Sequence, residues 1–91
     1  MLPVASSDVI ISSLDDGAVL FSAKDEVYYG LNAVGLRVWQ LLPPAHRTLD
    51  ELCSRLQQEF VGVDYDTLAA DVSELLAELT RFGLVVYSDA H

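Results

Sequence analysis

The stretch "KDEVYYGLNAVGLRVW" (residues 24–39) decides the fold, because it predicts a β-strand that runs directly into an α-helix. In residues 26–31 the side chains alternate between the two faces of a strand: Val27, Tyr29 and Leu31 share one face, and Glu26, Tyr28 and Gly30 share the other. Asn32 is a suitable N-cap for a helix over residues 33–42, and the two prolines that follow end it. This helix is apolar on more than one side, so we expect it to be well buried, with Trp39 in the core.

Two further β-prone runs precede this strand, at residues 9–12 and 18–22. The segment "LDDG" (residues 14–17) separates them and supplies an Asp-Gly turn, since Gly17 tolerates a positive φ. The segment "AKD" (residues 23–25) is a plausible short turn into the third strand. The sequence therefore predicts a three-stranded antiparallel meander with the tyrosine-rich strand third in order.

The rest of the chain predicts two more helices and a final strand. The second helix starts at a capping box, in which the Thr48 hydroxyl caps the helix and Glu51 reaches back. The third helix has Asp64 as its N-cap and Gly83 in the left-handed position after its end. Residues 84–87 then form a short strand. Apolar stripes support both helices: Leu49, Leu52, Cys53, Leu56 and Phe60 on the second, and Tyr65, Leu68, Val72, Leu75, Leu79 and Phe82 on the third.

The predicted fold class is α+β: a small winged-helix-like domain with a three-stranded antiparallel sheet, three helices and a short C-terminal strand. At 91 residues the chain is expected to form a single domain spanning residues 1–91. Hydrophobic residues make up 52% of it, which argues against disorder.

Composition also limits the compartment and the partners. The chain has no apolar run long enough to cross a membrane, no signal peptide is recognisable, and the single cysteine leaves a reducing cytoplasm as the expected location. The net charge is −9, from 14 acidic and five basic residues. Nucleic acid is therefore an unexpected partner, because binding it depends on Lys and Arg. The acidity either favours a neutral or basic partner or simply keeps an apolar domain in solution.

The sequence predicts no enzyme, cofactor or metal site. Cys53 lies on an apolar helical stripe, where a thiol is usually a small buried hydrophobe. The two histidines, His46 and His91, lie in a loop and at the last position, and form no recognisable catalytic or zinc spacing.

Three acidic residues recur at helical spacing on the third helix: Asp71, Glu74 and Glu78. They form either a solvated face or an acidic border of a groove that receives a basic peptide side chain. Arg81 lies three residues after Glu78, so part of this face could be paired within the helix.

The third strand is the candidate binding element, because the last strand of a meander lies at a sheet edge. An edge strand presents unpaired backbone N–H and C=O groups that another extended chain can use. Such strand addition combines main-chain hydrogen bonds with pockets for alternate side chains. A helix with an apolar flank beside the strand would supply those pockets.

These residues closely resemble the PqqD-like proteins, from about residue 17 to 87. The resemblance rests on "VYYGLNAVGLRVWQLL", "RTLDELCSRLQQEF" and "DVSELLAELTRFGLV". It includes the Y-x-L-N motif of residues 29–32, the spacing of Gly35 and Trp39, the T-x-x-E-L motif of residues 48–52, the Asp71-Val72 pair and the Gly-Leu-Val of residues 83–85.

The resemblance implies a non-enzymatic adaptor that captures the leader segment of a ribosomally made precursor peptide as an extra strand. The leader would lie on the third strand, beside the third helix. The aromatic "YYGLN…W" form looks more like the lasso-peptide branch, whose partners are a cysteine-protease-like leader peptidase and an ATP-dependent cyclase. Carried over position by position, the peptide-binding residues are Glu26, Val27, Tyr28, Tyr29, Gly30, Asp71, Val72, Leu75 and Leu76, while Leu68, Leu79 and Phe82 look more like core.

Three alternatives remain open at this point. One is the pyrroloquinoline quinone branch of the same family, whose members act with a radical enzyme. Another is a winged-helix transcription regulator, which the three helices and final strand suggest and the −9 charge disfavours. The last is a purely structural subunit of a peptidase complex.

Overall fold

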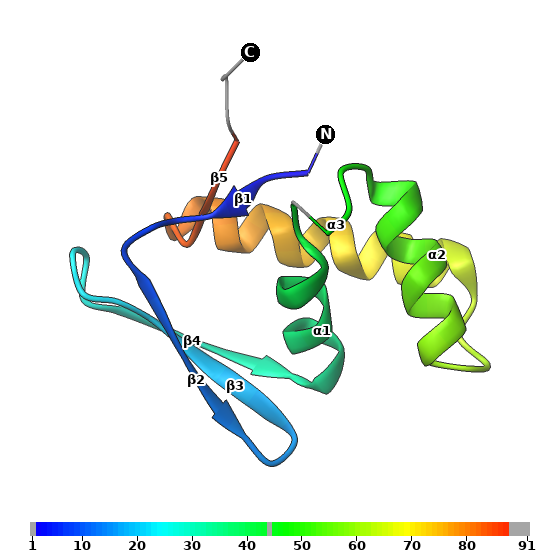
Figure 1. Ribbon diagram of the computed structural model, residues 1–91, viewed down its shortest axis with the longest axis horizontal. Helices are drawn as coiled ribbons and strands as arrows, with labels where there is room; N and C mark the ends of the chain where they lie inside the picture. The colour runs from blue at the N-terminus through cyan, green and yellow to red at the C-terminus, as the bar shows by residue number, and fades with distance from the viewer. Residues whose placement is uncertain (1, 44, 88–91) are drawn as a thin grey trace.

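The computed structural model of the chain describes residues 2–43 and 45–87. Figure 1 shows the sheet of long strands on one side, α2 on the other, and α3 spanning the distance between them. In chain order the elements are β1 (Val4–Ala5), β2 (Val9–Leu14), β3 (Gly17–Ser22), β4 (Val27–Asn32), α1 (Ala33–Leu41), α2 (Leu49–Glu59), α3 (Tyr65–Arg81) and β5 (Val85–Val86). This confirms the predicted α+β class, with a three-stranded antiparallel sheet, three helices and a short C-terminal strand.

The main sheet has the strand order β2-β3-β4, so β4 lies at an edge, as the meander predicted. Leu20 of β3 pairs with Tyr29 of β4 and with Ile11 of β2, which places these three side chains on one face. Glu26 was expected to begin this strand, but β4 begins at Val27. Glu26 has a φ of 55°, a left-handed turn conformation that is not compatible with a strand.

The sequence did not predict β1. Val4 of β1 pairs with Val86 of β5, and Ala5 pairs with Val85, in a separate two-stranded antiparallel sheet. A strand of two residues carries no readable alternation. It exists only because the fold brings the two ends of the described chain together, as Figure 1 shows.

The three helix starts follow the predicted caps. The side chains of Asn32, Thr48 and Asp64 each accept a hydrogen bond from the backbone N–H three residues later, at 2.8, 3.1 and 3.2 Å respectively. The capping box of α2 is incomplete, however. The Glu51 carboxylate accepts from the backbone N–H of Arg47 at 3.2 Å instead of reaching back to Thr48.

The end of α3 is a Schellman motif. Gly83 has a φ of 73°, and its N–H donates to the carbonyl of Thr80 at 3.0 Å. The N–H of Leu84 donates to the carbonyl of Leu79 at 2.9 Å, which gives the paired hydrogen bonds of this motif. The chain thereby reverses and directs β5 toward β1.

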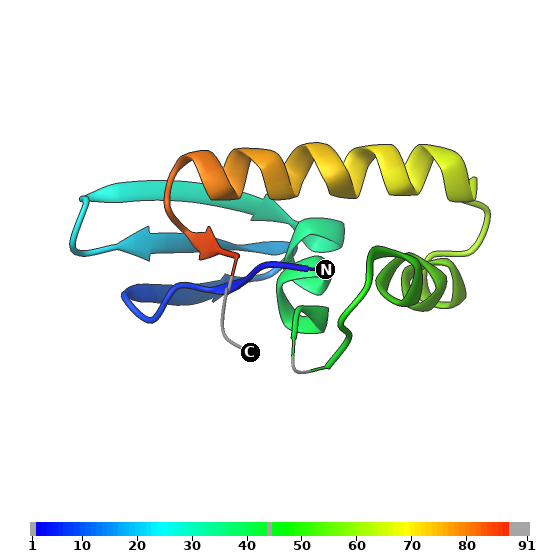
Figure 2. The ribbon, with the colours of Figure 1, turned by 90° about the horizontal axis from the view of Figure 1, so that it is seen from above.

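The core fills the space between the inner face of the sheet and the three helices. Figure 2 shows α3 along the β4 side of the sheet, with α1 between the sheet and α2. Cys53 is fully buried in the core, as its place on the apolar stripe predicted, whereas Trp39 is only partly buried against it. Fully buried aliphatic residues come from every layer: Leu20, Val38, Leu52, Leu56, Leu79 and Leu84. Within the described ranges, no helix combines the length and apolar character needed to cross a membrane.

Candidate functional site

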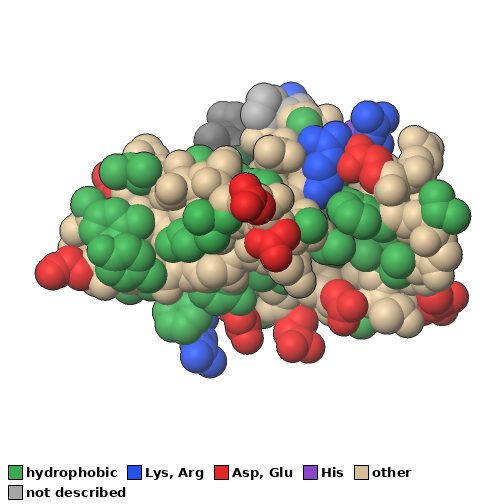
Figure 3. Space-filling model, turned by 90° about the horizontal axis from the view of Figure 1, so that it is seen from below, with side chains coloured by type: hydrophobic (Ala, Val, Ile, Leu, Met, Phe, Trp, Pro, Cys, Tyr) green, Lys and Arg blue, Asp and Glu red, His purple; other side chains and the backbone are tan. Residues whose placement is uncertain are grey.

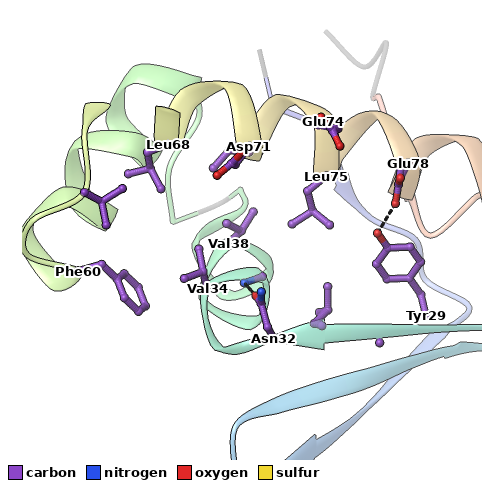
Figure 4. A pocket seen from close by; sticks show the side chains of 15 residues that line it. Tyr29, Asn32, Val34, Val38, Phe60, Leu68, Asp71, Glu74, Leu75 and Glu78 are labelled. Carbon is purple, nitrogen blue, oxygen red and sulfur yellow. Dashed lines mark hydrogen bonds between the residues drawn. The ribbon is translucent and has the colours of Figure 1, made fainter. Parts of the chain in front are cut away.

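A cleft of about 460 Å³ separates β4 from α3. One wall is the second half of β4, and the opposite wall is the face of α3 between Leu68 and Glu78. The floor comes from α1, and one end is closed by the loop between α2 and α3. Figure 4 shows the side chains of Val34, Val38 and Leu75 directed into this space. The predicted edge strand and the predicted helix therefore face each other across a cleft.

The β4 wall combines an apolar face with an accessible backbone. Leu31 is 6% exposed and points inward with the half-buried Tyr29, as the alternation predicted. Gly30 lies between them, and a Cβ placed on it would meet no atom within 4 Å. Because β3 pairs with only one side of β4, every second residue of β4 directs its N–H and C=O toward the free edge.

The α3 wall is apolar inside and acidic along its rim. Leu68 and Val72 are buried and Leu75 is half-buried, and all three line the cleft. The rim consists of three exposed acidic residues: Asp71, Glu74 and Glu78. Figure 3 shows Asp and Glu side chains gathered along the lower margin of this face. The three residues are therefore both exposed to solvent and placed at the border of the groove.

The positive charges of the described chain do not neutralise this rim. Arg37 of α1 and Arg55 of α2 both bind Glu59, at 2.6 and 2.9 Å. Arg81 forms no ion pair with Glu78, although sequence spacing suggested one, and its guanidinium lies 5.1 Å from the centre of the Phe82 ring. Among residues 2–43 and 45–87, Asp71 and Glu74 have no ion-pair partner.

One hydrogen bond crosses the cleft from wall to wall. The Tyr29 hydroxyl donates to the Glu78 carboxylate, as the dashed line in Figure 4 shows. This bond raises the pKa of Tyr29 to about 12, with desolvation and the negative charges of Glu78 and Glu74 contributing in the same direction. Tyr29 is therefore a neutral donor at physiological pH.

Five of the nine residues predicted to bind peptide line the cleft: Tyr29, Gly30, Asp71, Val72 and Leu75. The other four lie outside its lining. Glu26 is in the turn before β4, and Val27 is at the start of the strand. Tyr28 is 72% exposed on the opposite sheet face, where its ring lies 4.6 Å from that of Phe21. Leu76 is 4% exposed and belongs to the core, because the rotation of α3 turns Leu75 toward the cleft instead.

Sequence reasoning missed several residues that line the cleft. Phe60 was assigned to the apolar stripe of the second helix, but it caps the end of α2 and lines the cleft. Leu68 was expected in the core; it is buried and also lines the cleft. Val34 and Val63 complete the apolar end. No local signal identifies these four residues, since only the packing of α1 and α2 against α3 brings them together.

The described residues contain no cluster of three or more side chains suited to metal binding. The pKa of the Cys53 thiol is raised by burial and by the nearby Asp50, which disfavours the reactive thiolate. The features that distinguish the cleft are its backbone edge, its apolar walls and its acidic rim, and these suit binding of an extended peptide.

Comparison with known proteins identifies the family. Residues 17–85 match the family described as coenzyme PQQ synthesis protein D (PqqD). The chain belongs to the PqqD family. This confirms the resemblance read from the sequence motifs. No curated protein matches this PqqD-family chain.

Two solved structures share the fold. TbiB1, in complex with the TbiA(beta) leader peptide, is 32% identical with a TM-score of 0.80, and the match covers 94% of this chain and 99% of TbiB1. A lasso peptide synthetase B1, complexed with its leader peptide, matches with a TM-score of 0.81 over 94% and 99% of the two chains. At 20% identity this second match shows the fold alone.

Proposed function

We propose that this PqqD-family chain is a non-catalytic adaptor that binds the leader segment of a ribosomally made precursor peptide. The leader adds as an antiparallel or parallel strand to the free edge of β4 and packs its inward side chains against α3. The observation that carries this proposal is the cleft itself, in which an unpaired strand edge faces the apolar side of a helix. TbiB1, whose structure holds a leader peptide, supports it at 32% identity.

The energetics agree with a joint role for backbone and side chains. About five main-chain hydrogen bonds, each contributing ~0.5–1.5 kcal/mol, supply roughly 3–7 kcal/mol before ordering costs. Micromolar affinity needs about 8 kcal/mol, so backbone pairing alone falls short. Two or three apolar side chains buried against Leu75, Val34 and Phe60, at ~1.5–3 kcal/mol each, make up the difference. The groove therefore selects a peptide with apolar residues at alternate positions.

In the lasso-peptide pathway, the bound leader would be delivered to a cysteine-protease-like leader peptidase, with the core segment passed to a cyclase. The aromatic "YYGLN…W" stretch favours this branch, because it looks more like the lasso-peptide members of the family. The family description favours a second candidate, a role in pyrroloquinoline quinone synthesis with a radical enzyme. Co-purification tests the choice: the tagged chain is expected to retain the peptidase encoded beside it, and retention of a radical enzyme instead would favour the second candidate.

Leader binding is tested by fluorescence anisotropy. The probe is the fluorescein-labelled leader of the precursor peptide encoded beside this protein's gene, and the control is a scrambled peptide of the same composition. We expect saturable binding in the micromolar range or tighter. Equal affinity for the leader and the scrambled peptide would refute the proposed function.

Strand addition is tested by removing backbone donors. Replacing single leader residues with N-methyl residues should weaken binding at alternate positions only, because every second N–H of an added strand faces β4. In the protein, Tyr28→Pro should abolish binding through loss of an edge donor, provided that circular dichroism shows a folded variant. An N-methyl scan without a two-residue period would contradict this binding mode.

A further inference from the structure

Two similar hydrogen bonds hold α3 at its two ends. Near the C-terminal end, the Tyr29 hydroxyl donates to the carboxylate of Glu78. In the first turn, the Tyr65 hydroxyl donates to the carboxylate of Asp50 at 2.6 Å. Both bonds pair a neutral phenol with a carboxylate, and each raises the pKa of its tyrosine to about 12. They differ in what they join, since the first links α3 to β4 and the second links α3 to α2.

The Tyr29 bond spans the cleft. In the part of the chain that the structure describes, it is the only hydrogen bond that joins α3 to the three-stranded sheet. The same ring also contacts Phe82, the residue that caps α3, with ring centroids 5.9 Å apart. One side chain of the edge strand therefore contacts the C-terminal end of α3 at two points, and Figure 4 shows the hydroxyl contact.

We propose that Tyr29 and Glu78 form a strut that presets the width of the peptide groove. Tyr29 acts as a positioning residue for recognition, beyond any contact that it makes with the peptide. The inference rests on the proposed function and deepens it.

The reason is geometric. An added strand lies ~4.8 Å from β4, so α3 must stand at one fixed distance if its apolar side is to pack on that strand. Near its middle, α3 borders the open cleft on the side that faces β4. A groove held at the correct width before binding avoids the cost of ordering the helix during binding. Without the strut, we expect the C-terminal half of α3 to move relative to β4 in the free protein.

The test compares two matched variants. Tyr29→Phe removes the strut hydroxyl and keeps the ring that packs on Phe82. Tyr65→Phe removes the equivalent hydroxyl at the other end of the same helix, outside the cleft lining. Affinity for the fluorescein-labelled leader is measured well below the melting temperature of both variants. Tyr29→Phe should weaken binding roughly 3- to 10-fold, which is the range of one hydrogen bond, and Tyr65→Phe should leave it unchanged.

A double-mutant cycle assigns the loss to the bond itself. Glu78→Leu should weaken binding about as much as Tyr29→Phe, and the double variant should show no further loss. Wild-type affinity in Tyr29→Phe, equal losses in Tyr29→Phe and Tyr65→Phe, or additive losses in the double variant would each overturn the strut.

A second measurement needs no peptide. Hydrogen exchange in the free protein should speed up in residues 74–81 of Tyr29→Phe, and not in the same residues of Tyr65→Phe. Unchanged exchange there would overturn the strut even if the leader does not bind. Failure of the wild type to bind the leader, with the exchange difference present, would instead refute the proposed function and leave the strut as a feature of the free protein.

Discussion

Leu75 and Leu76 are adjacent residues on α3 with different surroundings. Replacing each with alanine is expected to affect leader binding in one case and folding stability in the other. Leu75 is half-buried and lines the cleft, whereas Leu76 is 4% exposed and packs in the core. Sequence reasoning placed both in the peptide site. The structure predicts that Leu75→Ala impairs leader binding and that Leu76→Ala impairs folding.

The expected magnitudes follow from the two environments. Truncating a buried leucine costs about 2–5 kcal/mol of unfolding free energy, so Leu76→Ala should be the less stable variant. Leu75→Ala should cost roughly 1–2 kcal/mol of unfolding free energy, because its side chain is already partly in contact with water. The bound peptide would cover the Leu75 side chain, so Leu75→Ala should also lose ~1–2 kcal/mol of binding free energy. This loss corresponds to an affinity about 5- to 30-fold weaker.

Urea unfolding gives the two unfolding free energies, and anisotropy with the labelled leader gives the two affinities. Affinities are corrected for the folded fraction measured by circular dichroism at the assay temperature. We expect the corrected affinity of Leu76→Ala to equal that of the wild type. A folded Leu75→Ala variant with wild-type affinity, or a corrected loss in Leu76→Ala as large as that in Leu75→Ala, would refute this assignment of the two faces.

Two further predictions concern stability. A Cβ at Gly17 would lie 2.0 Å from the carbonyl oxygen of Leu31, whereas one at Gly30 meets nothing within 4 Å. Gly17→Ala should therefore lower the unfolding free energy by about 1–3 kcal/mol or more, and Gly30→Ala should raise it by ~0.5–1 kcal/mol, as urea unfolding can show. In the second prediction, the hydrogen bond from Arg37 lowers the pKa of Glu59 from 4.5 to about 2. A lowered folded-state pKa stabilises the fold above the unfolded-state value, so this contribution should be lost as the pH falls from 4.5 toward 2. The melting temperatures of the wild type and Glu59→Gln should converge as the pH falls over that range. A difference that stays constant with pH would contradict a stabilising role for the ionised Glu59 carboxylate.

The sequence by itself determined most of the local structure. Asn32, Thr48 and Asp64 cap their helices as predicted, and Gly83 ends α3 in the left-handed conformation. These features can be predicted from the sequence because a cap or a turn depends on atoms within four residues of one another. The meander could also be predicted from the sequence, because consecutive strands joined by short turns pair with each other. That order predicted β4 at an edge, and the pairing of β5 with β1 in a separate sheet leaves this edge free in the described chain.

Tertiary structure decided the site. The stripe expected from the sequence included Leu75 and not Leu76, but the packing of α1 and the sheet against α3 buries Leu76 and leaves Leu75 half-buried at the cleft. Phe60 entered the cleft, and Tyr29 met Glu78, through contacts between residues far apart in the chain. Such contacts depend on how whole elements pack and leave no local pattern. The sequence therefore determined which strand is open to a partner, and the packing of α3 decided what lies opposite it.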